Sequence, residues 1–403
     1  MIKRLLYLVI LLIGSIWISS CSKQRGCTDP IAENYNVDAE KDDGSCVYIY
    51  GCTDPDSKNY NPEATKNDGS CVYGSDPTPA PLQIPQIFVQ YLGAPYIPND
   101  NPQTVEGIAL GRKLFYDPIL SANNTQACAD CHSPASAFTD TNQFSTGIDG
   151  IPGNRNSMPI FNLAWNTANK FFWDGRATGL EGQAFGPVVN PVEMHNTWPN
   201  AVASLQAHPA YPGLFEAAFG TSTIDSNLVV KAIAQFERTL ISANSKFDRY
   251  QMGIEPLTPQ ELSGLNLFMD TQGGDCMHCH GSPANPLWTD YEFKDNGLQA
   301  TYVDLGLGGV TGSSFDDGKF KTPSLRNLLF TAPYMHDGRF ATLDEVIDFY
   351  SSGLNNTPNI SSQMEHISTG GVQLTPSEKA DLKAFLLTLT DYDYITNPNY
   401  QAP

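Results

Sequence analysis

Two short segments of the sequence combine paired thiols with a histidine. Residues 128–132 read C-A-D-C-H and residues 276–280 read C-M-H-C-H, so both contain C-x-x-C followed directly by histidine. In this pattern two thiols add to the vinyl groups of a haem, and the adjacent histidine supplies a nitrogen ligand to the iron. We therefore predict two covalently bound c-type haems. Their attachment residues are Cys128, Cys131 and His132 in the first site and Cys276, Cys279 and His280 in the second.

Zinc binding and thiol redox chemistry also use C-x-x-C, but neither explains this pair. The two copies are too far apart for a zinc ribbon, and both lack the strand and helix context of a thioredoxin motif. Only the histidine directly after the second cysteine has the right reach to bind iron, so we expect His278 to be a polar turn residue. The spacing predicts one haem per domain, in domains at residues 87–250 and 251–395, with a boundary near residues 245–257.

The elements that position these sites are predicted to be helices joined by long loops. Capping boxes, in which a threonine precedes a glutamate by three residues, predict helices that begin after Thr258, Thr342 and Thr375. Stretches rich in glycine and proline, such as residues 133–160 and 281–324, separate the helices. We therefore predict a mainly α fold of two c-type cytochrome domains with long loops, each wrapping one haem.

The composition excludes some classes of partner. The 403 residues carry 43 acidic and 23 basic side chains, which gives a formal net charge of -20. This charge disfavours binding to nucleic acid and favours a basic protein partner.

The first residues have the pattern of a bacterial secretion signal. Lys3 and Arg4 precede an apolar run over residues 5–13, which is too short to be a favoured membrane span. The run leads to Cys21 in a sequence that resembles a lipobox, so residues 1–20 are predicted to be removed and Cys21 to carry a lipid. We expect an exported, periplasmic protein anchored to a membrane, with the outer membrane favoured. An uncleaved signal anchor is the alternative.

Residues 21–73 contain two copies of a unit with a period of 25 residues, and residues 74–86 form a Pro-rich linker. Each copy is too small for a core of its own, so we predict one disulfide within each copy. The polar side chains of the repeats would also suit calcium-binding loops, but no full twelve-residue ligand pattern is present. A polar stalk is therefore the favoured interpretation. The predicted disulfides join Cys27 to Cys46 and Cys52 to Cys71.

Further blocks of sequence resemble one family. The blocks are R-N-S at residues 155–157, F-W-D-G-R at 172–176, G-P-V-V-N-P-V-E-M at 186–194, L-R-N at 325–327 and A-P-Y-M-H-D-G at 332–338. Together they resemble the bacterial diheme cytochrome c peroxidase and MauG family. The resemblance implies that the N-terminal haem meets peroxide and that the C-terminal haem takes electrons from a donor.

The resemblance implies catalytic roles for three residues. Trp173 matches the tryptophan that relays electrons between the haems, and Gln183 and Glu193 match the distal pocket at the peroxide haem. By itself, Trp173 would be interpreted as a core residue. Glu193 also has the chemistry that peroxide cleavage needs, because a carboxylate can move a proton from one peroxide oxygen to the other. Its apolar neighbours in the sequence are expected to raise its pKa.

The resemblance also implies a calcium ion between the domains. Asn156 and the backbone carbonyls of Thr331 and Pro333 match the ligands, and oxygen ligands suit a hard cation. These three ligands are few, so water must complete the site. Arg326 and His336 resemble residues around the second haem and its propionates, with a cap or loop role as the alternative for each.

Two departures point to the MauG branch. Many diheme peroxidases place a second histidine in a loop after the first motif, but no histidine occurs here between His132 and His195. Many also use a methionine fourteen residues after the histidine of the A-P-Y-M-H-D-G block, here His336, whereas the MauG branch uses tyrosine. That position is Tyr350, which we predict as the distal ligand of the second haem. An ordinary core tyrosine is the alternative, in which case Met364 is the substitute ligand.

We expect a peroxidase that reduces hydrogen peroxide with electrons from a small cytochrome c or cupredoxin. One alternative is a MauG-like enzyme that oxidises side chains of a partner protein, and another is a diheme electron carrier or redox sensor without turnover. An open peroxide haem and Glu193 argue against the carrier, which needs neither. A homodimer remains open.

Overall fold

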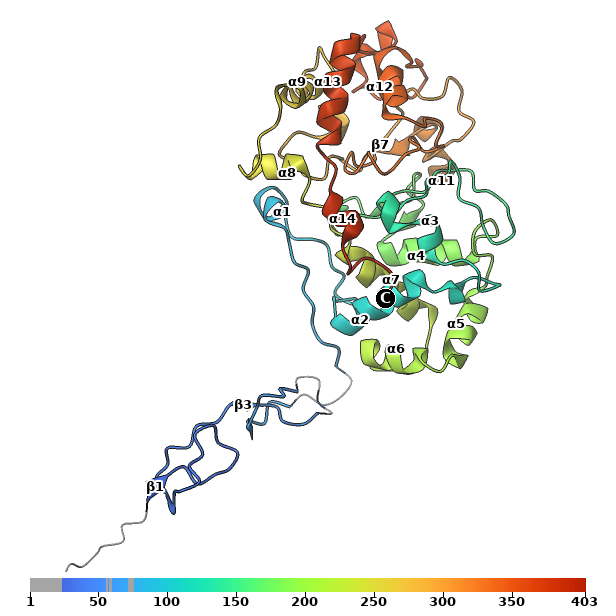
Figure 1. The fold of residues 1–403 in the computed structure, drawn as a ribbon. Helices are drawn as coiled ribbons and strands as arrows, with labels where there is room; N and C mark the ends of the chain where they lie inside the picture. Colours follow the sequence, from blue (N-terminus) through green and yellow to red (C-terminus); the bar gives the residue numbers. More distant parts are fainter. Residues whose placement is uncertain (1–23, 56, 58–59, 72–75) are drawn as a thin grey trace, which may run out of the picture. The chain divides into compact units, whose positions relative to one another are not determined.

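The computed structural model describes residues 24–403 except residues 56, 58–59 and 72–75, and its chain divides into two compact units. The first ends at Gly74 and contains the repeats, and the second runs from Ser75 to Pro403 (Figure 1). The predicted signal peptide and Cys21 lie outside the described residues. Among the described helices, none is both long and apolar enough to cross a membrane.

Each repeat is held by one disulfide and one pair of short parallel strands. The structure joins Cys27 to Cys46 and Cys52 to Cys71. In the first repeat the amide of Asn34 donates to the carbonyl of Ser45 at 2.6 Å, so a side chain takes over backbone bonding that a longer sheet would supply. The strand pairs are β1 (Arg25–Gly26) with β2 (Lys41–Asp42) and β3 (Tyr50–Gly51) with β4 (Lys66–Asn67).

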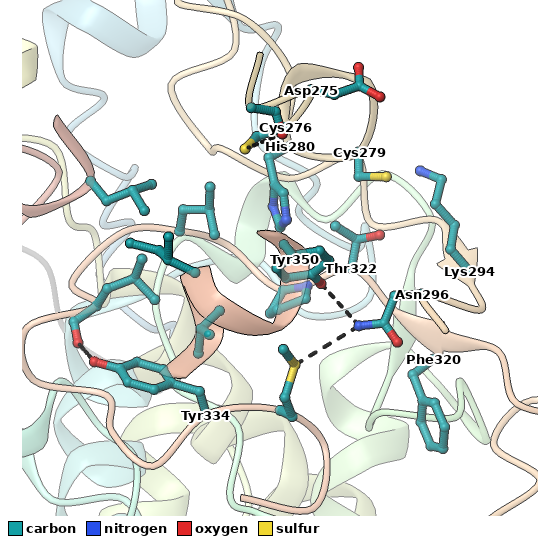
Figure 2. A pocket seen from close by; sticks show the side chains of 18 of the residues that line it. Asp275, Cys276, Cys279, His280, Lys294, Asn296, Phe320, Thr322, Tyr334 and Tyr350 are labelled. Carbon is teal, nitrogen blue, oxygen red and sulfur yellow. Dashed lines mark hydrogen bonds between the residues drawn. The ribbon is translucent and has the colours of Figure 1, made fainter. Parts of the chain in front are cut away.

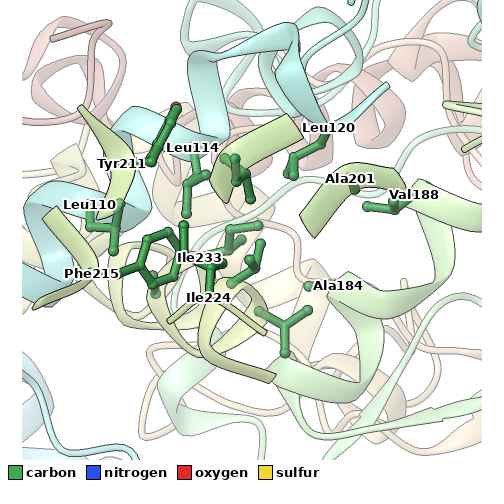
Figure 3. Packing of buried hydrophobic residues seen from close by; sticks show 14 of the residues in the cluster. Leu110, Leu114, Leu120, Ala184, Val188, Ala201, Tyr211, Phe215, Ile224 and Ile233 are labelled. Carbon is green, nitrogen blue, oxygen red and sulfur yellow. The ribbon is translucent and has the colours of Figure 1, made fainter. Parts of the chain in front are cut away.

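The first half of the larger unit is a set of helices around one apolar core. Its central pair is α2 (Val105–Tyr116) and α7 (Ser226–Thr239). Gly111 lets these helices pack closely, because any larger residue there would place its side chain against the carbonyl of Ala232. Leu110, Leu114 and Ile233 lie in this core (Figure 3). The other helices of this half are α1 (Gln86–Tyr91), α3 (Cys128–Cys131), α4 (Leu180–Val189), α5 (Trp198–Ala207) and α6 (Tyr211–Phe219).

In the second half a glycine again allows two helices to pack closely, here α9 (Pro259–Met269) and α13 (Pro376–Leu387). A side chain at Gly264 of α9 would collide with the carbonyl of Asp381 in α13. The three predicted capping boxes are confirmed at α9, α12 (Leu343–Ser352) and α13. The other helices of this half are α8 (Lys246–Gln251), α10 (Met277–His280), α11 (Gly308–Thr311) and α14 (Tyr392–Thr396).

Long loops connect the helices, and the mainly helical prediction is confirmed. The strand pairs in these loops are short and antiparallel: β5 (Lys170–Phe171) with β6 (Ala177–Thr178), and β7 (Phe293–Lys294) with β8 (Phe320–Lys321). Single turns of 3-10 helix complete the described elements. They are η1 (Pro118–Leu120), η2 (Pro134–Ser136), η3 (Leu163–Trp165), η4 (Ser314–Asp316) and η5 (Glu365–Thr369).

The C-terminal segment returns to the first half of the unit. Tyr394 of α14 packs against Phe138 with ring centroids 5.6 Å apart, and Arg112 of α2 donates to the carbonyls of Pro398 and Gln401, each at 2.7 Å. The end of the chain therefore ties the halves together, and the predicted domain boundary near residues 245–257 stays a prediction.

Candidate functional site

The first C-x-x-C-H segment presents its three functional side chains from one helical turn. Cys128 and Cys131 are free thiols at the two ends of α3. The carboxylate of Asp130 accepts the backbone N–H of Ala127 at 2.7 Å, which fixes the start of this turn. The Nδ1 of His132 lies 2.8 Å from the carbonyl of Phe138, so Nδ1 carries the proton and Nε2 is free to bind a metal.

The second segment has the same arrangement. Cys276 and Cys279 are free thiols, and the Nδ1 of His280 lies 3.3 Å from the carbonyl of Trp288. Burial lowers the pKa of His280 to about 4, so its imidazole is neutral at pH 7 and can act as a ligand. His278 instead lies 2.7 Å from the carboxylate of Asp275, in agreement with a polar turn role.

A cavity of about 220 Å³ opens beside the second segment. It is lined by Cys276, Cys279, His280, Tyr350 and Met364, so both candidate distal ligands face the same space. Figure 2 shows the rings of His280 and Tyr350 projecting into this cavity from α10 and α12.

Tyr350 has a polar partner that sequence reasoning missed. The Nδ2 of Asn296 donates to the Tyr350 hydroxyl at 3.0 Å and lies 3.9 Å from the Sδ of Met335, which also lines the cavity (Figure 2). Burial raises the pKa of Tyr350 well above its usual range, so the side chain is a neutral phenol unless a cation binds it. No local signal marks Asn296, because its partner is 54 residues away.

Trp173 connects the two halves beside the same cavity. Its indole is 8% exposed, and Nε1 donates to the carbonyl of Asn156 at 2.8 Å. The backbone N–H of Lys321 in β8 donates to the carbonyl of Trp173 at 2.8 Å. Groups from both halves therefore hold this residue, the first through its indole and the second through its backbone, and Trp173 lines the cavity of the second site.

A charge network surrounds Trp173. Arg155 pairs with Asp174 at 2.5 Å and, across the halves, with Asp304 at 2.8 Å. Lys321 is 4% exposed and donates to the carbonyl of Lys170 at 3.2 Å, and its burial lowers its pKa to about 8. The sequence signalled Arg155 through the R-N-S block but gave no sign of Asp304 as its partner.

Glu193 lies beside the first attachment site, in the turn that follows α4. It is half-buried, and its Oε1 accepts the Nδ2 of Asn190 at 2.6 Å. Burial raises its pKa, against the lowering effects of Asn190 and Arg176. Burial also raises the pKa of the nearby Cys128, with a small further contribution from the charge of Glu193. Gln183 is half-buried on α4, the helix that leads to this turn.

The three predicted calcium ligands line the cavity of the second site together. Asn156, Thr331 and Pro333 all contribute to its wall, and the Nδ2 of Asn156 donates to the carbonyl of Asn142 at 3.2 Å. In the part of the chain that the structure describes, no three His, Cys, Asp or Glu side chains cluster to hold a metal. Carbonyl and amide oxygens are the donors available, and the calcium ion stays a prediction.

Arg326 and His336 have different environments. His336 lines the cavity and stacks on Phe320 with ring centroids 3.6 Å apart. Arg326 is completely buried in a bidentate pair with Asp248, at 2.6 and 2.9 Å, and donates to the carbonyl of Pro286. This geometry ties together neighbouring segments of the chain, so it fits the cap or loop role and not a place beside the haem propionates.

The residues present fit two covalently attached haems. All four motif cysteines are free in a chain whose repeat cysteines are paired, and both histidines direct Nδ1 to a carbonyl and leave Nε2 for iron. The second motif also opens on a cavity with a mainly apolar wall, as a porphyrin requires.

Comparisons with known proteins agree with this geometry. Residues 105–255 match the family model described as di-haem cytochrome c peroxidase. The chain is 40% identical over 298 residues to the methylamine utilization protein MauG of Methylorubrum extorquens, covering 72% of this chain and 80% of that protein. It is 36% identical over 256 residues to cytochrome c551 peroxidase of Nitrosomonas europaea, covering 61% of this chain and 73% of the relative.

A solved structure also matches closely. The crystal structure of a MauG-like protein associated with microbial copper homeostasis superposes with a TM-score of 0.69 at 35% identity, covering 79% of this chain and 98% of that one. The helical fold, the two C-x-x-C-H sites and these similarities lead to one conclusion: the chain belongs to the di-haem cytochrome c peroxidase and MauG family of haem peroxidases.

Proposed function

We propose that the protein reduces hydrogen peroxide to water with electrons from a small redox protein, a cytochrome c or a cupredoxin. The observation that carries the proposal is the half-buried Glu193 beside the first attachment site, with a pKa raised by burial and one amide as its hydrogen-bond partner. An electron carrier has no need of such a group, whereas peroxide reduction requires one.

The chain's own residues supply binding and proton transfer. A bound haem would provide the iron at which the O–O bond of peroxide is reduced. Glu193 accepts a proton from one peroxide oxygen and donates it to the other, which leaves as water. Gln183, on the helix that precedes this turn, would orient peroxide by hydrogen bonding.

Electrons for this reaction enter at the second site. Trp173 would conduct them: it lines the second cavity, and Arg176, three residues further on, is close enough to Glu193 to act on it electrostatically. Its Nε1 donates to a backbone carbonyl, which is a weak base, so the indole keeps its proton when it loses an electron. This arrangement favours rapid electron relay without proton transfer.

The test is the reaction of the fully oxidised protein with hydrogen peroxide, followed by stopped-flow spectroscopy, with and without a small reduced cytochrome. Because the loop after the first motif contains no histidine, we expect a reaction without prior reduction and steady oxidation of the cytochrome. Absence of any reaction with peroxide, before or after reduction, would refute the proposal.

A second candidate is a MauG-like enzyme that oxidises side chains of a partner protein. The similarity to MauG and to the MauG-like protein associated with copper homeostasis favours it. The same experiment discriminates: peroxide that is consumed only when a protein substrate replaces the cytochrome would favour this candidate.

We also propose Tyr350 as distal ligand of the second haem, with His280 on the other face. The support is that Tyr350 and His280 line one cavity and that Asn296 can donate to a phenolate oxygen. A calcium ion at Asn156, Thr331 and Pro333 is proposed on the same grounds of shared location. Calcium analysis of the chelator-treated protein, with the spectrum of the second haem, tests this ion.

The proposed location is the periplasm, with a lipid on Cys21 as the membrane anchor. The two disulfides of the repeats support an oxidising compartment. Mass spectrometry of the mature N-terminus and fractionation of Cys21→Ser test the anchor: release of this variant from membranes is expected, and unchanged membrane association would refute it.

A further inference from the structure

Peroxide reduction has a proton demand that Glu193 alone does not meet. The overall reaction takes up two electrons and two protons per peroxide and gives two water molecules. Glu193 returns to its starting state when it moves one proton between the peroxide oxygens, so the two consumed protons must come from solvent. The inference below therefore rests on the proposed function.

One candidate pair lies next to Glu193 on the same turn. The carbonyl of Asn190 accepts the backbone N–H groups of both Glu193 and His195, each at 3.0 Å. The side chain of Asn190 donates to the Glu193 carboxylate at 2.6 Å. Asn190 thus fixes the backbone of both residues and the side chain of Glu193.

A second loop brings an acid to this histidine. The N–H of Ile148 donates to the carbonyl of Glu193 at 3.0 Å, and a side chain at Gly147 would collide with the carbonyl of Val192. This close packing places Asp149 so that its Oδ2 lies 2.5 Å from the Nδ1 of His195. The ring is thereby held with Nδ1 toward the carboxylate and Nε2 free.

The pair is exposed to bulk water, whereas Glu193 is half-buried. The side chains of His195 and Asp149 are 53% and 44% exposed. A contact between two side chains this exposed adds little to stability, so stability does not explain it.

We propose that His195 and Asp149 form a proton relay that resupplies Glu193 from solvent. His195 is a positioning residue in this scheme, because it acts through Glu193 and does not touch peroxide. The imidazolium releases its Nε2 proton through water to the Glu193 carboxylate, and the neutral ring takes a new proton from bulk water. Asp149 holds the ring in the orientation that this transfer requires.

The test follows one turnover of the haem-loaded protein with one equivalent of hydrogen peroxide and a reduced cytochrome. A pH-indicator dye reports proton uptake, and the haem spectrum reports the initial reaction with peroxide. In His195→Gln we expect proton uptake to slow ten-fold or more while the initial reaction keeps its wild-type rate. Added imidazole should restore uptake, and Asp149→Asn should show a smaller loss.

His208→Gln is the matched control, since it removes a histidine from α5's end in the same half without contact to this turn. Wild-type proton uptake in both His195→Gln and Asp149→Asn would overturn the relay. An electron paramagnetic resonance signal of a second histidine on the first haem, lost in His195→Gln, would also overturn it, because the side chain would then be a ligand. No initial reaction in any protein, wild type included, would instead refute the proposed peroxidase function.

Discussion

A buried carboxyl in the first half gives a stability prediction with a defined sign. Glu237 of α7 is 4% exposed, and its Oε2 has no hydrogen-bond partner. Burial raises its pKa from 4.5 to about 8, with a smaller raising effect of Glu181 that Arg238 opposes. The folded protein therefore keeps a proton on this group across the neutral range, whereas the unfolded chain loses it.

The magnitude follows from this difference in proton binding. Between pH 4.5 and about 8 the unfolded state binds fewer protons than the folded state, so the free energy of unfolding falls as pH rises. Each pH unit costs about 1.4 kcal/mol, which amounts to about 3 kcal/mol at pH 7. Glu237→Gln removes this cost because a neutral amide replaces the carboxyl. At roughly 2 °C per kcal/mol, the variant should melt about 6 °C higher at pH 7.

Thermal unfolding of the haem-loaded protein at pH 5 and at pH 7 to 8 measures the effect. The difference between Glu237→Gln and wild type should be small at pH 5 and grow with pH. Glu216→Gln controls for the loss of one negative charge, since Glu216 is an exposed side chain of α6. If the melting temperatures of Glu237→Gln and wild type differ by the same amount at every pH, the inference that Glu237 is protonated in the folded protein at neutral pH is wrong.

Four further predictions address the site and its support. Mass spectrometry of the mature protein should show two haem additions. One addition, or bound zinc, would contradict the prediction that each C-x-x-C-H segment binds one haem. Glu193→Gln should keep both haems and slow the peroxide reaction by about 10² to 10⁴, and the wild-type rate should fall toward acid at a pH above 4.5, since burial raises the carboxyl pKa. Near-infrared magnetic circular dichroism should lack a sulfur-to-iron band; a band lost in Met364→Ala and kept in Tyr350→Phe would show that methionine is the ligand. Asp248→Asn should lower the free energy of unfolding by about 3 to 5 kcal/mol in urea titrations, because it leaves Arg326 buried without its partner, and an unchanged value would contradict the buried pair.

Local chemistry could be predicted from the sequence, and contacts between distant segments could not. The capping boxes at Thr258, Thr342 and Thr375 need only residues three apart, so the helices they open were predicted. Cysteine counting predicted the two repeat disulfides, because each repeat contains one pair. The pairing of Arg155 with Asp304 joins residues 149 apart, and nothing in either neighbourhood indicates it.

The candidate site divides in the same way. The family resemblance placed Tyr350 and His336 by counting along one segment, and both line the second cavity. Asn296, which donates to Tyr350, lies on a loop of another segment and was missed. The return of the C-terminal tail onto α2 was also missed, because Arg112 binds backbone carbonyls, which exist at every residue and carry no sequence signal.

The two halves share one scaffold but give their haem sites different surroundings, and this difference supports a division of labour. In both, a glycine brings two helices together, at Gly111 in α2 and at Gly264 in α9, and a histidine follows a C-x-x-C turn with Nδ1 toward a carbonyl. The first site adds the half-buried carboxyl of Glu193, whereas the second adds Tyr350, a side chain able to fill a coordination position. Since an iron with a filled coordination position exchanges electrons and an iron with an open one binds small substrates, this difference supports the proposal that peroxide reacts at the first site and electrons enter at the second.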